Sequence, residues 1–385
     1  MRQLIASLFC AALLLAVTVT ADQTYECVVE KRDDESVCIF RNVNYGANTT
    51  GVTFKAPPPG KIQHVAFEDS TLDHIPKEFL SAFPNLRSLS VPNANLSSVV
   101  IPTKLERLYA SGNQISRVIV HQTRDSTTMQ ELMLDSNHLR DVSNLTRLVK
   151  LEILNLSDNR DLPVDDTIDL GLFKGMDGLR HLLLSDVGAH YVENEQDVPL
   201  PNLELLDLSN NRILTSSFKV KALAPLKSLQ ILRLGYNQLV DLDVLQLTQN
   251  NPQLKQIYLE GSQFPCKLQT MILKHLKRVG VETPVTNPEA RCPLGFDKEE
   301  GLCCKSDLTS IANVVPQTPG GNQMSGTVTM RPMETSTMAS TTSPVTARPT
   351  KQDSDGNSSA AKLPLGNGSW LISLVLVTVV KLALF

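Results

Sequence analysis

The sequence predicts an α/β solenoid, a horseshoe of about nine repeats with a parallel β-sheet on its concave face and a disulfide-bonded cap at each end. Three observations predict this fold class. An eleven-residue, leucine-rich pattern recurs through the middle of the 385-residue chain. The long interval between Cys38 and Cys266 contains no cysteine, so its stability has to come from stacking. The remaining cysteines flank that interval, where a stack of repeats needs covers for its apolar ends.

The repeats follow the template L-x-x-L-x-L-x-x-N-x-L, whose positions are numbered 1 to 11 below. Close copies begin at Leu105, Met129, Leu151, Leu203 and Leu229. Looser copies begin at Ile62, Leu86, Leu179 and Leu254. Across residues 62–264 the chain therefore resembles the leucine-rich repeat family. A unit of this kind cannot bury its apolar face alone, whereas stacked units share one core.

Position 9 is the second fixed feature of the template. Its asparagines are expected inside the solenoid, bonded to backbone groups where each coil leaves its strand; they are Asn113, Asn137, Asn159, Asn211 and Asn237. The looser copies carry Ser70, Ala94, Val187 and Ser262 there instead. We expect the ladder of asparagines to be imperfect at those four places.

The N-terminal segment predicts secretion. Residues 1–21 have a basic residue, an apolar run and small residues before Asp22, which is typical of a signal peptide. Its removal takes away Cys10 and leaves six cysteines, an even number that suits three disulfides in an oxidising compartment. Residues 22–61 form the predicted N-terminal cap, in which Cys27 and Cys38 close a small hairpin.

The predicted C-terminal cysteine cap covers residues 265–307. Cys266, Cys292, Cys303 and Cys304 allow three pairings, and we expect Cys266 and Cys292 each to pair with one of the two adjacent cysteines. Zinc is the alternative for four cysteines, but their spacing lacks paired C-x-x-C halves. The segment after Cys266 predicts an amphipathic helix whose apolar residues share one face; they are Leu268, Met271, Ile272, Leu276 and Val279.

This cap narrows the resemblance. The sequence F-P-C, then a helix, then RCPLGFDKEEGLCCKSD is similar to the C-terminal cysteine pattern of the mosquito leucine-rich immune protein family. Long members of that family continue into a coiled coil, form disulfide-linked heterodimers and bind thioester-containing, complement-like proteins. No heptads follow Cys304, so the chain resembles a coil-less, membrane-attached member. The heterodimer role is therefore not carried over to this chain.

The C-terminal segments predict attachment to a membrane. Residues 308–369 are rich in Ser, Thr and Pro and are expected to form a disordered stalk that includes the anchor-attachment region. Residues 370–385 are an apolar tail, and the small residues near Asn357 and Ser358 precede it at a distance typical of a glycosylphosphatidylinositol (GPI) anchor signal. A short membrane span and a plain hydrophobic C-terminus are the alternatives, and Lys381 within the tail weakens the anchor interpretation. The predicted location is the extracellular face of the plasma membrane.

Binding is the predicted activity. No hydrolase, metalloprotease or phosphate-loop motif occurs, so we expect no enzyme, cofactor or metal site. The net charge of −4 argues against a general nucleic-acid binder. Positions 3 and 5 of the repeats predict a concave patch for a protein or pathogen-surface ligand; it comprises Tyr109, Met133, Ile153, Leu183, Leu205, Ile231, Arg233 and Tyr258.

Glycosylation bears on that surface. Sequons occur at Asn48, Asn95, Asn144 and Asn155 in the predicted ectodomain, and Asn155 falls on the concave face beside Ile153. The leading hypothesis is an innate-immune recognition or co-receptor protein that binds pathogen products or a complement-like thioester protein. The alternative is a cell-adhesion or developmental leucine-rich repeat receptor.

Overall fold

The computed structural model describes residues 23–32, 34–58, 61–162 and 165–306. The predicted signal peptide, stalk and hydrophobic tail lie outside these residues, as do the anchor candidates Asn357 and Ser358. Within the described part of the chain, no helix has the length and apolar character needed to cross a membrane. The described residues include the repeats and most of both caps.

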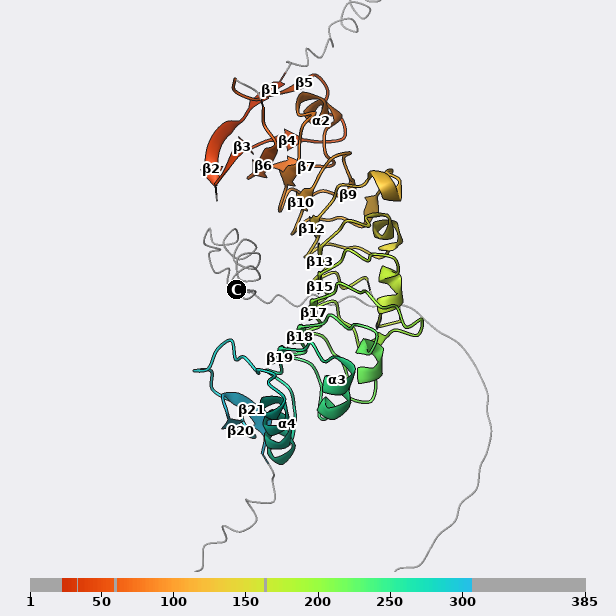
Figure 1. The fold of residues 1–385 in the computed structure, drawn as a ribbon. Coiled ribbons are helices and arrows are strands. Elements are labelled where there is room, and N and C mark those ends of the chain that lie inside the picture. The colour runs from red at the N-terminus through yellow and green to blue at the C-terminus, as the bar shows by residue number, and fades with distance from the viewer. Residues whose placement is uncertain (1–22, 33, 59–60, 163–164, 307–385) are drawn as a thin grey trace, which may run out of the picture. The chain divides into compact units, whose positions relative to one another are not determined.

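One eleven-stranded sheet runs through the described residues, and nine of its strands come from the nine repeat copies. These nine are parallel and stack in the order of the sequence, along the side opposite the helices and helical turns (Figure 1). They are β6 (His64–Glu68), β8 (Ser88–Ser90), β10 (Arg107–Tyr109), β12 (Glu131–Met133), β13 (Ile153–Asn155), β15 (His181–Leu183), β17 (Leu205–Asp207), β18 (Ile231–Arg233) and β19 (Gln256–Tyr258). The α/β solenoid predicted from the repeats is confirmed.

The strands occupy the same template positions in every copy. Position 4 is paired with position 4 of the next strand throughout, as in Leu108 with Leu132 and Leu132 with Leu154. Those leucines are fully buried, while their neighbours at positions 3 and 5 face the other side because side chains alternate along a strand. The period-two pattern of L-x-L thus sets which side chains enter the core.

The chain turns out of each strand at position 8. In all nine copies the residue there has a φ between 47° and 71°, the left-handed region that disfavours most side chains; the residues are Asp69, Asn93, Gly112, Ser136, Asp158, Asp186, Asn210, Tyr236 and Gly261. Seven of the nine are Gly, Asn or Asp, the residues that tolerate this conformation best. The looser copies therefore share the phase of the close ones.

The position 9 asparagines form the predicted internal ladder. Each is nearly inaccessible to solvent, and each bonds backbone groups of its own coil and of the preceding one. Asn137 accepts from the Ile115 amide at 2.9 Å and donates to the carbonyls of Ala110 and Leu134 at 3.0 Å. These bonds satisfy buried polar groups at the turn, which would otherwise be costly.

Where a copy lacks asparagine, the next one compensates. Val187 stands at position 9 of its copy, and Asn211 then accepts from two amides of that coil, those of Val187 and Ala189. Asn113 does the same for Ala94 and Leu96. At Ser70 the hydroxyl itself accepts from the amide of Val43. Three of the four expected imperfections are therefore bridged, in different ways, whereas the Ser262 hydroxyl has no hydrogen-bond partner among the described residues.

Short helices and strands return each coil to the next strand. The helical segments are α2 (Lys77–Ala82), η1 (Arg124–Ser126), η2 (Ser143–Arg147), η3 (Leu170–Phe173), η4 (Val220–Leu223) and α3 (Val244–Asn250). The short paired strands are β4 (Asn44–Tyr45) with β7 (Thr71–Leu72), β9 (Ser98–Val100) with β11 (Arg117–Ile119), and β14 (Thr167–Asp169) with β16 (Tyr191–Glu193). Buried Asn194 and Asn251 bond the backbone of these return segments, outside the template positions.

The N-terminal cap is a hairpin joined to an aromatic cluster. Strand β1 (Gln23–Glu26) pairs with β5 (Val52–Lys55), and β2 (Val28–Arg32) pairs antiparallel with β3 (Glu35–Arg41), which extends the main sheet. Cys27 and Cys38 form the predicted disulfide. Five phenylalanine rings with centroids 5.1–6.2 Å apart fill the end of the core beneath the cap; they are Phe40, Phe54, Phe67, Phe79 and Phe83.

The C-terminal cap is built from α4 (Cys266–Arg278) and the hairpin of β20 (Phe296–Glu299) and β21 (Leu302–Lys305). Disulfides join Cys266 to Cys304 and Cys292 to Cys303, so each of the two earlier cysteines pairs with one of the adjacent cysteines, as expected.

The predicted apolar face of α4 was partly wrong. The buried side chains are Gln269, Ile272, Leu273 and Leu276. Met271 and Val279 are 68% and 46% exposed, because the face centred on Ile272 and Leu276 points inward and Met271 lies about 100° away from Ile272 around the helix.

Candidate functional site

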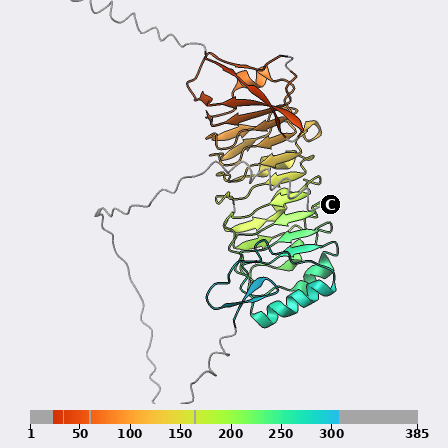
Figure 2. The same cartoon turned by 90° about the vertical axis from the view of Figure 1, so that its left-hand side faces the viewer.

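The concave face of the sheet is formed by two columns of side chains that the strand register defines. Figure 2 shows this face turned toward the viewer, with the N-terminal hairpin at one end of the sheet. One column holds position 3 of the later repeats; it is Glu131, Ile153, His181, Leu205, Ile231 and Gln256. The other holds position 5 of the same strands; it is Met133, Asn155, Leu183, Asp207, Arg233 and Tyr258. All eight residues of the predicted patch stand in these columns or beside them on β10.

The apolar members of the patch are packed against one another. Met133, Leu183, Leu205 and Ile231 are only 2–8% exposed, and Ile153 is half-buried. Parallel strands lie about 4.8 Å apart, so neighbouring side chains in a column touch and cover each other. The sequence identified the residues that share the face, whereas their low exposure depends on contacts between strands. The apolar columns are consequently a floor, and the polar side chains around them are the accessible groups.

A polar cluster lies on β17, β18 and β19. The guanidinium carbon of Arg233 lies 5.1 Å from the ring centroid of Tyr258, in cation–π geometry. One Arg233 Nη lies 3.4 Å from an oxygen of Asp207, whose other oxygen accepts from the amide and hydroxyl of Ser209. Arg233 and Tyr258 are half-buried, so a ligand can reach them. Arginine and tyrosine in this setting are typical of binding hot spots.

Buried polar atoms without partners gather around that cluster. His181 Nδ1, Arg233 Nε and Gln256 Oε1 have no hydrogen-bond partner among the described residues. Burial lowers the pKa of His181 to about 4, so this ring is neutral at physiological pH. Buried polar atoms without partners are rare in proteins and costly. This end of the concave face therefore offers donors and acceptors that a bound molecule could satisfy.

The N-terminal end of the face is closed by ion pairs from the cap. Arg107 on β10 donates to both carboxylate oxygens of Glu35 at 2.7 Å and approaches His64 at 3.1 Å. Glu35 is 72 residues away in sequence, at the start of β3. On the same strand the Tyr109 hydroxyl donates to Glu131 at 2.7 Å, and burial raises the pKa of Tyr109. These groups bind one another and leave less to offer a ligand than the Arg233 end.

Asn155 is half-buried in the middle of the concave face. Its side chain donates to Asp135 at 3.0 Å and accepts from the Ser157 amide at 3.1 Å. Burial raises the pKa of Asp135. Among the other sequons, Asn48 and Asn95 are exposed and Asn144 is half-buried in η2. Glycosylation at these four asparagines stays a prediction, and the hydrogen bonds of Asn155 make it the one whose glycan would disturb folded structure.

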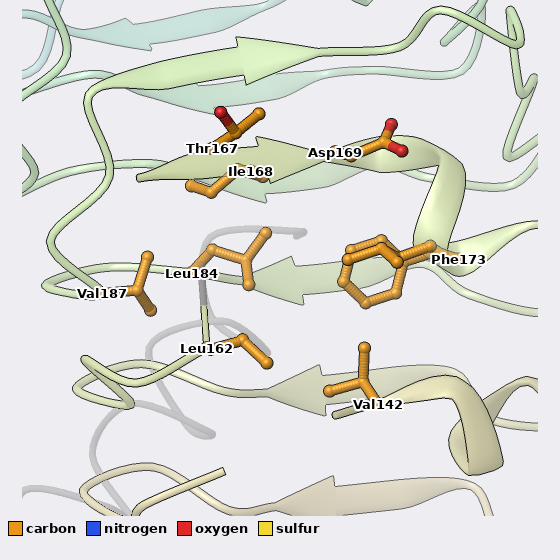
Figure 3. A pocket seen from close by; sticks show the side chains of 9 residues that line it. Val142, Leu162, Thr167, Ile168, Asp169, Phe173, Leu184 and Val187 are labelled. Atoms are coloured by element: carbon orange, nitrogen blue, oxygen red, sulfur yellow. The ribbon is translucent and has the colours of Figure 1, made fainter. Parts of the chain in front are cut away.

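A small cavity and a cluster of two cysteines with a glutamate are two further candidate sites among the described residues. A cavity of about 10 Å³ lies between the return segments, lined mainly by apolar side chains such as Leu162, Ile168 and Phe173 (Figure 3). It has room for about one water molecule and none for a ligand. Cys266, Glu299 and Cys304 lie close enough for a metal site, but the two sulfurs form a disulfide and are not thiolate ligands. Neither feature competes with the concave face.

The repeats, the parallel sheet and the disulfide caps define a leucine-rich repeat protein. No family model and no curated protein matches the chain. Among solved structures it is similar to the leucine-rich repeat domain of APL1B, with 23% identity over 66% of this chain and 78% of that one and a TM-score of 0.48.

Two further solved structures are similar to this chain. A chain of the LRIM1/APL1C complex is 17% identical over 76% of this chain and 72% of its own, with a TM-score of 0.33. Internalin C2 from Listeria monocytogenes is 23% identical over 48% of this chain and 75% of its own, with a TM-score of 0.36. The fold assignment itself rests on the repeats and sheet of this chain.

Proposed function

We propose that this chain is a cell-surface binding protein of innate immunity whose concave face recognises a protein or a pathogen-surface ligand. The polar cluster of Arg233, Tyr258 and Asp207 is the observation that carries the proposal. It joins an accessible cation–π pair to buried polar atoms that lack partners. The capping cysteines add the resemblance to mosquito leucine-rich immune proteins, from which a complement-like thioester protein is the first partner to test.

A double substitution tests the concave face. Arg233→Ala with Tyr258→Ala removes the accessible groups while leaving the apolar floor intact. Arg140→Ala with Tyr191→Ala is the matched control, since both side chains are exposed and lie outside the strands of the concave sheet. Substitutions in the floor are unsuitable, because a charge at Leu205, which is 2% exposed, would disturb folding.

The readout is binding of the full chain to a purified thioester-containing, complement-like protein and to intact microbial cells. The concave double variant should bind at least tenfold more weakly than the unmodified chain. The control variant should bind as the unmodified chain does. Unchanged binding by a folded concave variant would refute the assignment of this face. Aggregation of cells that express the chain, with no binding to either probe, would instead favour the adhesion role.

The same proposal places the protein on the outer face of the plasma membrane through a GPI anchor. The support is the order of small residues near Asn357, spacer and hydrophobic tail in the sequence. Treating intact cells with a phospholipase specific for the inositol lipid should release the protein into the medium. Retention on treated cells, beside release of a known anchored control protein, would refute the anchor and favour a membrane span.

A further inference from the structure

Helix α4 in the C-terminal cap has an unusual charge pattern. Its 13 residues include Lys267, Lys274, Lys277 and Arg278 and no acidic residue. The chain as a whole carries −4 and this helix alone carries +4, so all other residues together carry −8. A strongly basic helix on an acidic protein is a local field of opposite sign, which attracts anions to one place.

The basic residues share the face of α4 that points away from the core. The helix buries Gln269, Ile272, Leu273 and Leu276. Lys267, Lys274 and Arg278 are exposed and follow one another at helical spacing on the opposite face. Met271, 68% exposed, lies between them in the same row. From Lys267 to Arg278 the row extends about 16 Å along the helix axis.

Helix stability alone does not account for this row. Basic residues in the last turn interact favourably with the helix dipole, which explains Lys277 and Arg278. Lys274 lies three and four residues before two other cations, and like charges at that spacing are destabilising. The usual remedy, an acidic residue on the same face, is missing from the helix.

The elements next to α4 leave Lys274, Lys277 and Arg278 accessible. Helix α3 packs against α4 with no charged residue of its own, and its Thr248 hydroxyl bonds the His275 ring. On the side of the cap hairpin, Thr270 donates to Glu299. Lys274, Lys277 and Arg278 are all exposed.

We propose that this face of α4 binds a sulfated polysaccharide. A straight row of cations on the exposed side of a helix fits a linear polymer with repeated sulfate groups better than a single phosphate. The exposed Met271 side chain supplies an apolar contact for a sugar ring between the charges. The three disulfides indicate an oxidising, extracytoplasmic compartment, where sulfated polysaccharides are the abundant polyanions. This site is separate from the concave face and does not depend on it.

Heparin is the probe, and the full-length protein is the sample. The Kd for heparin at physiological salt should increase at least tenfold in the variant Lys274→Gln with Arg278→Gln. The slope of log K against log salt should fall by about two, because each lost cation releases about one counterion fewer. Lys55→Gln with Lys61→Gln removes the same charge from exposed positions at the other end of the chain and should change the Kd less than twofold.

Two further variants and one further probe make the result decisive. Lys274→Arg with Lys277→Arg keeps the charge and should keep heparin binding. Thermal unfolding of every variant should match that of the unmodified protein, since the substituted side chains are exposed. Absence of heparin binding by the unmodified protein, or equal losses in the α4 and control variants, would overturn the proposal. Binding to vesicles with anionic lipids but not to heparin would overturn it as well, in favour of a membrane surface.

Discussion

The asparagines of the ladder differ in how many buried backbone groups depend on each of them alone, and this difference allows a quantitative prediction. Replacing Asn137 by Ala leaves one buried group, the Ile115 amide, without its partner. The carbonyls that Asn137 served keep other donors: Ala110 is also bonded by Asn113, Leu134 by Asn159, and Asp135 by the Gly112 amide. An unsatisfied buried group costs about 1–3 kcal/mol, so we expect Asn137→Ala to reduce the free energy of unfolding by about 2 kcal/mol.

Asn211→Ala should cost much more. It leaves the amides of Val187 and Ala189 without an acceptor, and no other donor among the described residues is bonded to the Leu184 carbonyl. Three unsatisfied groups correspond to a loss of about 4–6 kcal/mol. The difference arises because Val187 replaces asparagine in the preceding copy. Adding Val187→Asn should recover about 1 kcal/mol, since an asparagine there can donate to the Leu184 carbonyl.

Equilibrium unfolding in urea, followed by far-ultraviolet circular dichroism, measures these differences as shifts of the midpoint at constant m-value. Gln249→Ala, an exposed substitution on α3, is the control and should shift the free energy by less than about 0.5 kcal/mol. Equal losses for Asn137→Ala and Asn211→Ala would refute the reasoning, because the two side chains would then contribute independently of their neighbouring repeats.

Three more predictions concern the histidine, the disulfides and the hairpin. Burial lowers the pKa of His181 to about 4 from the ordinary value of 6.5. The neutral ring therefore makes its full contribution to the stability of the fold above about pH 6.5, and this contribution is lost as the pH falls from 6.5 toward 4. Between about pH 7.5 and pH 5 the free energy of unfolding should decrease by about 2 kcal/mol less in His181→Gln than in the unmodified protein. The exposed His121→Gln is the control. An unchanged dependence of stability on pH in His181→Gln would contradict this prediction. Replacing both Cys266 and Cys304 by Ala should lower the free energy of unfolding by about 4 kcal/mol. Replacing both Cys27 and Cys38 should lower it by about 3 kcal/mol, because this disulfide closes a shorter loop. Urea midpoints in the reverse order would argue against loop entropy as the cause. Glu35→Gln should speed amide hydrogen exchange in β2 and β3, because it weakens the contact with Arg107. The control Glu26→Gln should leave the exchange rates unchanged. Equal protection in the two variants would show that the ion pair does not hold the hairpin.

The repeats and caps could be predicted from the sequence because their determinants are local. Position 4 leucines such as Leu132 identify the core, and the fixed phase of Asn137 and Asn211 identifies the turn. The loose copies were recognisable from the same phase, and all nine share the left-handed residue at position 8. The sequence also predicted that Cys266 and Cys292 each pair with one of the two adjacent cysteines, but it left open which one.

The character of the concave face could not be predicted to the same extent, since it depends on contacts between distant residues. Glu35 reaches Arg107 only because the hairpin extends the sheet, which no local pattern indicates. Burial of Leu205 and Ile231 follows from the packing of neighbouring strands rather than from either residue. The exposure of Met271 is a different case, because it follows from the local geometry of α4, which turns this apolar side chain to solvent.

The direction of the ladder bonds has a consequence for biosynthesis. Asn137, Asn159 and Asn237 each accept from an amide 20 to 24 residues earlier in the chain, so the coils that contain those amides are completed by the coil that follows. On the ribosome a coil therefore waits about 1–5 s for its closing side chain, at about 5–20 residues per second. The growing solenoid always ends in one unfinished turn. Ser262 of the last copy accepts no such bond among the described residues. The cysteine cap that follows it is the segment that terminates the stack of coils.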